Sequence, residues 1–165
     1  MTTLTPNSGK EQDWQKADAQ YSTFFVGDLF FGIDVLSVQE VLRFQEMTCV
    51  PLAPEVIEGL INLRGQIVTA VDLRRRLELE PRPPGMLAMN VVVRSDDGAV
   101  SLLVDEIGDV VEVEEDSFEL PPETLRGSVR TMIRGVHKLN DRLIHVLDIE
   151  KACQMTYVVE SAAAG

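Results

Sequence analysis

The sequence predicts a mainly β fold in which one small β unit is used twice. Each half of the chain contains a hairpin signal, and turn signals recur at near-regular spacing, a pattern that favours small barrels over a sandwich of long strands. A proline-rich segment at 80–85, EPRPPG, interrupts the chain, because neither a helix nor a central strand accepts such a run. We therefore expect two halves, of about 21–78 and 87–153.

The first elements of the two halves are hairpins. Residues 24–35 are two apolar runs joined by Gly-Asp at 27–28, which is a two-residue hairpin signal. Residues 91–104 repeat this arrangement with Asp-Gly at 97–98 as the turn. Each half is therefore expected to begin with two antiparallel strands.

Helices are expected to be few and short. Residues 36–43 are interpreted as a helix, because Val38, Val41 and Leu42 fall on one helical face and Ser-x-x-Glu at 37–40 could form a capping box. Shorter helical segments are expected at 54–58, 74–77 and 149–153.

An internal repeat is the strongest pattern in the chain. GLINLRGQIVTAVDL at 59–73 aligns with GVHKLNDRLIHVLDI at 135–149, 76 residues later, and the apolar positions of the two segments match. Three pairs are identical: Gly59 with Gly135, Leu63 with Leu139, and Asp72 with Asp148. Each copy predicts a strand, a tight turn and a second strand.

Composition limits the class of protein. The 165 residues carry a formal net charge of −12, which argues against affinity based on phosphate neutralisation. Cys49 and Cys153 are too few for a disulfide framework, no segment resembles a signal peptide, and the apolar runs are far below the roughly 20 residues that span a bilayer. We expect a soluble, reduced, cytoplasmic protein with a flexible arm at 1–20, an ordered domain at 21–153 and a flexible tail at 154–165.

Catalytic chemistry has little support in the sequence. His137 and His145 fall inside predicted strands, where we expect one packed and one exposed side chain rather than a catalytic base. Cys49 and Cys153 are interpreted as buried apolar side chains, and no Cys or His pair has zinc spacing. Nucleotide-binding and hydrolase signatures are absent from the sequence, so no enzymatic activity and no cofactor are predicted.

Charged residues are grouped in two places. The segment 95–125 has eleven acidic residues and no Lys or Arg, but it lacks the EF-hand pattern, and Val111 and Val113 alternate with glutamates as in a half-buried strand. A calcium site is therefore less favoured than a negative surface that could steer a basic partner. The arginines at 74–76, followed by Arg82, are interpreted as favourable charge at a helix C-terminus rather than as a nucleic-acid patch.

The turn at 62–65, Asn-Leu-Arg-Gly, differs from its counterpart Asn140-Asp141 by the cation at its tip. We expect Arg64 to be exposed and Gly65 to adopt the unusual backbone angle of the turn. Arg64 is either a partner contact or an ordinary surface arginine, and Glu40 either completes a cap or belongs to the same surface.

Four segments resemble the CheW family of bacterial chemotaxis coupling proteins. These segments are GIDVLSVQEVL (32–42), EVIEGLINLRGQIVTAVDLRRRL (55–77), VDEIGDVVEV (104–113) and GVHKLNDRLIHVLDIEK (135–151). The resemblance implies two small five-stranded SH3-like barrels in a pseudo-twofold arrangement, with a few short helices and no enzymatic activity. It also implies two partners, the cytoplasmic tip of a chemoreceptor and the regulatory domain of a CheA-type histidine kinase.

The resemblance also implies two sets of contact residues. The receptor groove would lie between the barrels and would be formed by Val38, Glu40, Val41, Gly59, Arg64, Gly65, Ile107 and Val110. Kinase contacts would lie at the outer end of the second barrel, at Phe118, Glu119, Leu120, Thr124 and Leu125. The sequence departs from the common family pattern at Glu119, where a basic residue is usual, and at Thr124, where an aromatic residue is usual.

Three alternatives stay open at this point. A CheW-like paralogue could serve a pilus, gliding or second-messenger pathway instead of flagellar chemotaxis. A small barrel could bind single-stranded nucleic acid, although only 5% of the residues are aromatic. An enzyme could use the acidic segment to hold a metal.

Overall fold

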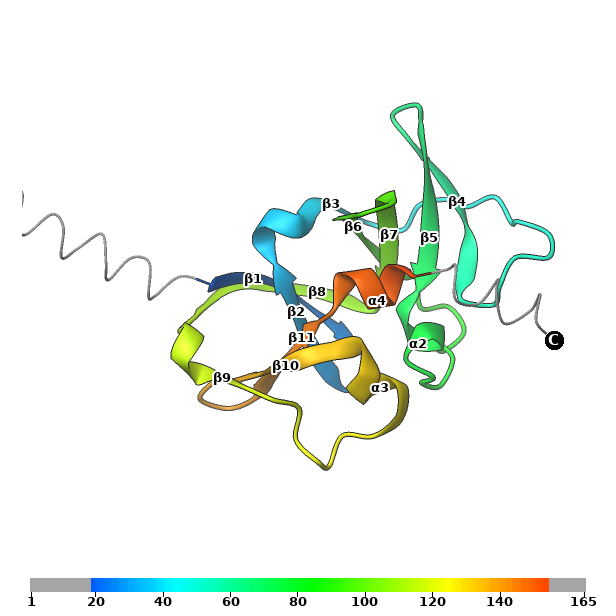
Figure 1. Ribbon diagram of the computed structural model, residues 1–165. Coiled ribbons are helices and arrows are strands. Elements are labelled where there is room, and N and C mark those ends of the chain that lie inside the picture. Colours follow the sequence, from blue (N-terminus) through cyan, green and yellow to red (C-terminus); the bar gives the residue numbers. More distant parts are fainter. Residues whose placement is uncertain (1–18, 155–165) are drawn as a thin grey trace, which may run out of the picture.

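The computed structural model describes residues 19–154 and contains two antiparallel-rich sheets with short helical segments between them (Figure 1). Sheet A has the strand order β8-β1-β2-β11-β10-β9, and sheet B has the order β3-β6-β7-β5-β4. The strands are β1 (Ala19–Val26), β2 (Leu29–Asp34), β3 (Val38–Leu42), β4 (Ile57–Leu63), β5 (Gln66–Asp72), β6 (Met89–Ser95), β7 (Gly98–Val104), β8 (Glu106–Val113), β9 (Phe118–Glu119), β10 (Ile133–Lys138) and β11 (Leu143–Leu147). The helical segments are η1 (Val35–Ser37), α2 (Leu73–Arg76), η2 (Glu115–Ser117), α3 (Gly127–Met132) and α4 (Ile149–Cys153). The prediction of a mainly β fold with a few short helices is confirmed, but sheet A has six strands where five were expected, because the short strand β9 adds to its edge.

The terminal predictions fall largely outside the described residues. The proposed arm at 1–20 and tail at 154–165 overlap with them only at Ala19, Gln20 and Gln154. Ala19 and Gln20 belong to β1, where they pair with β8, so the ordered part begins slightly before residue 21.

The internal repeat is visible in the backbone. The unit β4-β5-α2 corresponds to β10-β11-α4, and both copies have a register shift at the same place, between Ile57 and Gly59 and between Ile133 and Gly135. Asp72 and Asp148, the repeated acidic residue, each cap the helix that follows through a backbone N–H bond to the side chain. The repeated sequence therefore encodes a repeated local structure, down to its helix cap.

The two sheets do not correspond to the two halves of the sequence. Hairpin β1-β2 lies between β8 and β11, so sheet A combines strands from both sides of the proline-rich segment. Hairpin β6-β7 likewise lies between β3 and β5 in sheet B. The predicted barrel halves of 21–78 and 87–153 are therefore wrong as sheet boundaries, because each half gives its first hairpin to the sheet formed mainly by the other half.

The hairpins are present, with one shifted turn. Val26 pairs with Leu29 across the predicted Gly27-Asp28 turn. In the second hairpin Ser95 pairs with Gly98, so the turn residues are 96–97 rather than 97–98.

The helix predicted at 36–43 is wrong. This segment forms the short 3₁₀ helix η1 and then strand β3, in which the valines pair with β6. Its β-branched residues fit a pleated strand better than a short isolated helix. The segment 54–58 forms only a turn, closed by the N–H of Ile57 on the carbonyl of Pro54.

The remaining helices agree better with the sequence. α2 begins one residue before the predicted 74–77, and α4 has the predicted bounds. Helix α3 was not predicted, because Gly127 and the β-branched residues after it give no clear helical signal.

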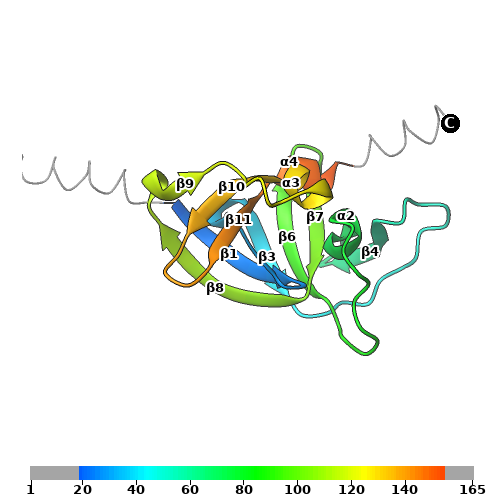
Figure 2. The ribbon, with the colours of Figure 1, turned by 90° about the horizontal axis from the view of Figure 1, so that it is seen from below.

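Both sheets contribute to one main core. Phe24 and Phe31 from sheet A and Leu102 from sheet B are fully buried in the same cluster, into which Ala152 of α4 also packs. Figure 2 shows α3 and α4 on the same side of the molecule as the ends of β6 and β10. The sheets therefore share the apolar surface that each would otherwise expose to water.

Candidate functional site

The β4-β5 turn places Arg64 at the tip of a hairpin that extends beyond the neighbouring strands (Figure 1). Leu63 pairs with Gln66, and the two turn residues both have positive φ, 54° at Arg64 and 88° at Gly65. Asn62 accepts the N–H of Gly65 through Oδ1 at 2.9 Å. These angles are typical of a tight hairpin turn and confirm the expected backbone of Gly65 and exposure of Arg64, whose side chain is 82% exposed.

Arg64 forms an ion pair with Glu40 on β3. Its Nη2 lies 2.6 Å from Glu40 Oε1, and Nη1 lies 3.4 Å from Oε2. The Glu40 side chain is only 18% exposed, so its position is well defined, while most of the guanidinium faces solvent. This pair has no local signal in the sequence, because β3 and β4 are opposite edges of sheet B and meet only after the sheet has curled.

The segment after β3 makes the second connection between these edges. Thr48 exchanges two backbone hydrogen bonds with Leu60 of β4, at 2.9 and 2.8 Å. Gly59 is buried under this segment, and a Cβ there would lie 2.7 Å from the Thr48 carbonyl oxygen. Gly59 therefore has a packing role beneath the predicted receptor surface rather than an exposed position on it.

The other predicted receptor residues differ in exposure. Val41 on β3 and Val110 on β8 are exposed, and Val110 retains 56% of its accessible surface. Val38 and Ile107 are half-buried and pack against the main core. The accessible part of this set is therefore Val41, Val110 and the Glu40–Arg64 pair.

The predicted kinase residues lie on β9 and the loop after it. Phe118 pairs with His137 of β10 in register, and Glu119 forms an exposed ion pair with Lys138 at 3.1 Å. Leu120 and Thr124 are exposed, whereas Leu125 packs against the main core. The segment thus presents Phe118 and Leu120 as accessible apolar side chains.

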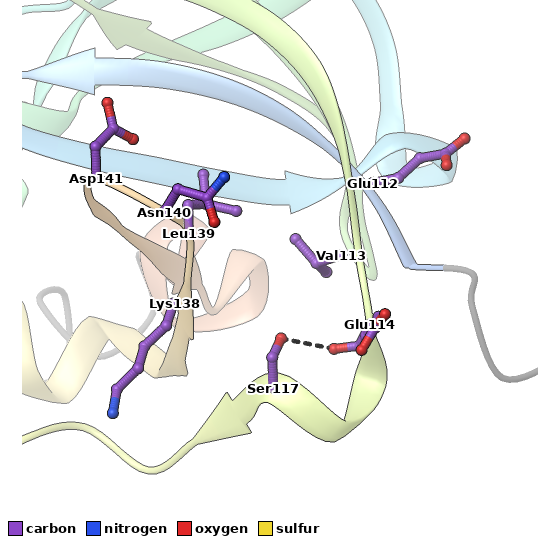
Figure 3. A pocket seen from close by; sticks show the side chains of 8 residues that line it. All are labelled: Glu112, Val113, Glu114, Ser117, Lys138, Leu139, Asn140 and Asp141. Carbon is purple, nitrogen blue, oxygen red and sulfur yellow. Dashed lines mark hydrogen bonds between the residues drawn. The ribbon is translucent and has the colours of Figure 1, made fainter.

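An open hollow of about 400 Å³ lies beside β9, between the end of β8, η2 and the β10-β11 turn (Figure 3). It is lined by Glu112, Val113, Glu114, Ser117, Lys138, Leu139, Asn140 and Asp141. Within residues 19–154, no three His, Cys, Asp or Glu side chains come together in a way that could hold a metal ion. The hollow is therefore a shallow polar surface, and the acidic residues of β8 occupy its solvated face as the alternation of Val111 and Val113 predicted.

Both histidines are buried, which contradicts the expectation that one would be exposed. His145 lies on β11 in the interior of sheet A, where its Nδ1 is 2.9 Å from the Phe30 carbonyl oxygen. His137 lies under Phe118 and Tyr21. The rings of Tyr21 and Phe118 cover His137, and the repeat alignment alone does not reveal them. The exposure expected from strand alternation was therefore wrong.

The cysteine predictions are half correct. Cys153 is buried, and burial raises the pKa of its thiol to about 12. Cys49, also predicted to be buried, is exposed in the segment after β3.

Arg74 and Arg76 of α2 and Arg82 of the proline-rich segment bind groups within the fold, whereas Arg75 is exposed and pairs with Glu58. Arg74 and Arg82 both bind the carboxylate of Asp105, through Nε distances of 2.9 and 3.0 Å to Oδ1. Arg76 is buried and donates to the Gln154 carbonyl oxygen. These cations are used within the fold, which argues against a nucleic-acid patch built on them.

Comparison with known proteins identifies the family. The CheW-like domain family matches residues 20–156. The chain is 30% identical over 149 residues to the probable chemotaxis protein CheW of Rhizobium etli, covering 90% of this chain and 94% of that protein. It is also 30% identical over 133 residues to the chemotaxis protein CheW of Bacillus subtilis, covering 81% and 85% of the two chains. The crystal structure of the scaffolding protein TtCheW from Thermoanaerobacter tengcongensis is similar, with a TM-score of 0.74 and 27% identity over 82% of this chain and 92% of that one. The chain therefore belongs to the CheW-like domain family.

Proposed function

We propose that the protein is a non-catalytic adaptor that couples the cytoplasmic tip of a chemoreceptor to a CheA-type histidine kinase. The family supports a scaffolding role. The observation that carries the proposal is the exposed Arg64, held by Glu40 at the tip of a hairpin, beside accessible apolar residues on a strand edge. A few apolar anchors with a charged rim are typical of a protein-docking surface.

The receptor surface is proposed to consist of Val41, Glu40, Arg64 and Val110. None of the described helices is long and apolar enough to cross a membrane. The receptor tip is a helical hairpin in the family, and its apolar stripe would pack on Val41 and Val110. The Arg64 fork would then bind a carboxylate or carbonyl oxygen on the receptor.

The kinase surface is proposed to consist of Phe118, Leu120 and the loop that follows. β8 and β9 are the two edges of sheet A, joined in sequence by η2. One hydrogen-bonded sheet would therefore bear Val110 from the receptor surface and Phe118 from the kinase surface. The mechanism is geometric, because binding both partners fixes the orientation of the kinase relative to the receptor. The protein would act on the cytoplasmic side of receptor arrays.

Two binding titrations test this proposal, one with a receptor-tip fragment and one with the kinase regulatory domain. Val41→Asp should abolish receptor binding and leave kinase binding unchanged, while Phe118→Asp should do the reverse. Val41 is preferred to Val38, because a charge at half-buried Val38 would also disturb the core. Leu87→Asp, a change at an exposed apolar residue before β6, is the matched control and should affect neither titration. Loss of both affinities in the Val41 variant would refute the separation of the two surfaces.

The role of the ion pair can be separated from the role of Arg64 alone. Arg64→Ala should weaken receptor binding while changing stability by about 1 kcal/mol or less, because an exposed ion pair contributes little. Glu40→Lys should weaken receptor binding more at low salt than at high salt, because salt screens charge interactions. The exchange Glu40→Arg with Arg64→Glu rebuilds a pair of opposite charges. Receptor affinity should stay low in the exchange variant if Arg64 itself binds the receptor.

The pathway is a further part of the proposal. The chain is 36% identical over 62 residues to protein FrzA of Myxococcus xanthus, a match that covers 38% of this chain. A CheW-like adaptor of a non-flagellar chemosensory pathway is the second candidate, because membership of the family does not determine the pathway. Genes adjacent to this one, and the motility phenotype of a deletion, would distinguish it from a flagellar adaptor.

A further inference from the structure

His137 is a buried residue that no contact surface described above uses. Its side chain lies on β10, is 2% exposed, and is contacted by β1, η2 and β9. Nδ1 lies 2.8 Å from Ser117 Oγ, and Nε2 lies 3.4 Å from the Tyr21 hydroxyl oxygen. The Phe118 ring meets the imidazole edge to face, with 5.3 Å between ring centroids. One imidazole therefore connects three elements.

The hydrogen bond to Ser117 places a proton on Nδ1, and burial of the ring favours its neutral form. The Ser117 hydroxyl donates to the Glu114 carbonyl oxygen at 2.7 Å, so it can only accept from His137 (Figure 3 shows the Ser117–Glu114 bond). Nδ1 is then the donor, and in the neutral ring Nε2 is the acceptor available to the Tyr21 hydroxyl. Protonation of Nε2 would remove the acceptor for Tyr21 and place a charge at a buried site, and burial accordingly lowers the pKa of His137 below 6.5.

Few other contacts hold β9 in place. It is two residues long and pairs with β10 only at Glu119 and Phe118. The Glu119–Lys138 ion pair is exposed on both sides and adds little. Gly135 of β10 allows close approach, because a Cβ there would collide with the Phe118 ring. The position of Phe118 therefore depends on its packing against His137 and on the Ser117 bond just before it.

The charged groups on the elements around His137 do not offset the lowering of its pKa by burial. The titratable and charged residues on the surrounding elements are Tyr21 on β1, Asp34 on β2, Glu106, Asp109 and Glu112 on β8, Glu114 before η2, Glu115 and Asp116 on η2, Glu119 on β9, Arg134 and Lys138 on β10, and His145 on β11. Of these side chains, Tyr21 is the one that hydrogen-bonds the ring in the described part of the chain. An imidazolium at this position would thus form within a largely uncharged contact shell.

We propose that neutral His137 is a positioning residue that holds β9 and Phe118 in the kinase-docking arrangement, and that proton uptake by His137 releases this edge. This inference rests on the proposed kinase contact at Phe118. If docking requires the neutral form, about a tenth of the molecules are competent one pH unit below the pKa of His137. The dissociation constant for the kinase domain should then rise about tenfold, while receptor binding at Val41 and Arg64 should not follow this titration.

The experiment measures both affinities between about pH 5 and pH 8 for the full chain and for two variants. His137→Gln keeps a donor and an acceptor but does not titrate, so kinase binding should lose its dependence on pH apart from any contributed by the kinase domain itself. His145→Gln, at the other buried histidine, is the matched control and should retain the wild-type dependence. If the wild-type and His137→Gln profiles coincide, the inference is wrong, whereas absence of kinase binding at every pH contradicts the proposed function instead.

A second measurement decides the question if the Gln variant does not fold. The chain has two histidines, so their imidazole resonances can be assigned and titrated in the wild-type protein. The protection factors of the Phe118 and Glu119 amides, which remove the intrinsic pH dependence of exchange, should fall at the pH where His137 protonates, while those of the β10 amides should not. Protection at β9 that does not change through the His137 titration would overturn the proposal.

Discussion

Replacing Asp105 with Ala should destabilise the protein more than any other change at an acidic residue considered above. Asp105 follows β7 and accepts hydrogen bonds from three places in the chain: the N–H of Gly27 in the β1-β2 turn at 2.6 Å, Arg74 of α2, and Arg82 of the proline-rich segment. Its side chain is 5% exposed. One carboxylate thus holds the sheet A hairpin, a sheet B helix and the connecting segment together.

The magnitude follows from the burial of its partners. The side chains of Arg74 and Arg82 are each only 12% exposed, so the alanine variant leaves two largely buried guanidinium groups without the counter-charge that they share. Removing one partner of a buried ion pair costs about 3–5 kcal/mol. With an unfolding entropy of about 2.1 cal/mol/K per residue over residues 19–154, this cost lowers the melting temperature by roughly 10–17 °C.

The assay is a thermal melt of the wild type, of Asp105→Ala and of the control Asp109→Ala. The control removes the same charge from an exposed position four residues later, and it should shift the melting temperature by only a few degrees. Equal melting temperatures for the two variants would refute the assignment of a structural role to the Asp105 cluster.

The same carboxylate predicts how stability depends on pH. Burial alone would raise the pKa of Asp105, but hydrogen bonds from Arg74, the Gly27 N–H and Arg82 outweigh it and hold the pKa below 3.8. The unfolded chain therefore binds a proton at this residue before the folded protein does as the pH falls. The contribution to stability is complete well above pH 3.8 and is lost as the pH falls through the folded pKa, so the difference between wild type and Asp105→Ala should shrink in acid.

Three further predictions follow from the packing. A fragment of residues 1–80 should aggregate or give a poorly dispersed NMR spectrum, because its β1-β2 hairpin lacks β8 and β11 as neighbours; a cooperative folded monomer would contradict the mixed sheets. Gly135→Ala should cost about 1–3 kcal/mol in a denaturant titration, because the added Cβ meets Phe118, and unchanged stability would show that β9 moves freely. Maleimide should label Cys49 quickly in the native protein and Cys153 only after unfolding, since burial raises the pKa of Cys153 to about 12; rapid labelling of both thiols would contradict this burial.

The sequence predicts local structure well where a physical pattern is contained in a few residues. The Gly27-Asp28 turn and the repeated strand-turn-strand unit depend on neighbours in the chain, and both are present. The exchange of hairpins between sheets is not encoded locally. The β1-β2 hairpin is compatible with either set of partner strands. Its position depends on which strand edge it pairs with and on which apolar surface its own apolar face then buries.

In the candidate site, too, local features could be predicted from the sequence and contacts between distant strands could not. Exposure of Arg64 could be predicted because its turn requires a positive φ and projects the residue from the hairpin. Its partner Glu40 could not, since the ion pair joins opposite edges of a curled sheet. The strand at β3 was mistaken for a helix because Val38, Val41 and Leu42 fit helical spacing, whereas in the strand Val38 and Leu42 share the half-buried face and Val41 lies on the exposed one.

The exchange of hairpins between the sheets also affects how such an adaptor would couple the orientation of the receptor to that of the kinase. Sheet A contains β1 and β2 from the beginning of the chain and β8 to β11 from its end, and its edges bear Val110 on one side and Phe118 on the other. The proposed receptor and kinase contacts are thus connected through strands that only the complete chain provides. A rotation of one partner would be carried through continuous hydrogen-bonded strands rather than through a flexible connection between two independent barrels. Because both sheets also pack on one core, any change that separates them, such as loss of Asp105, should weaken the coupling of the two binding sites before it abolishes either affinity.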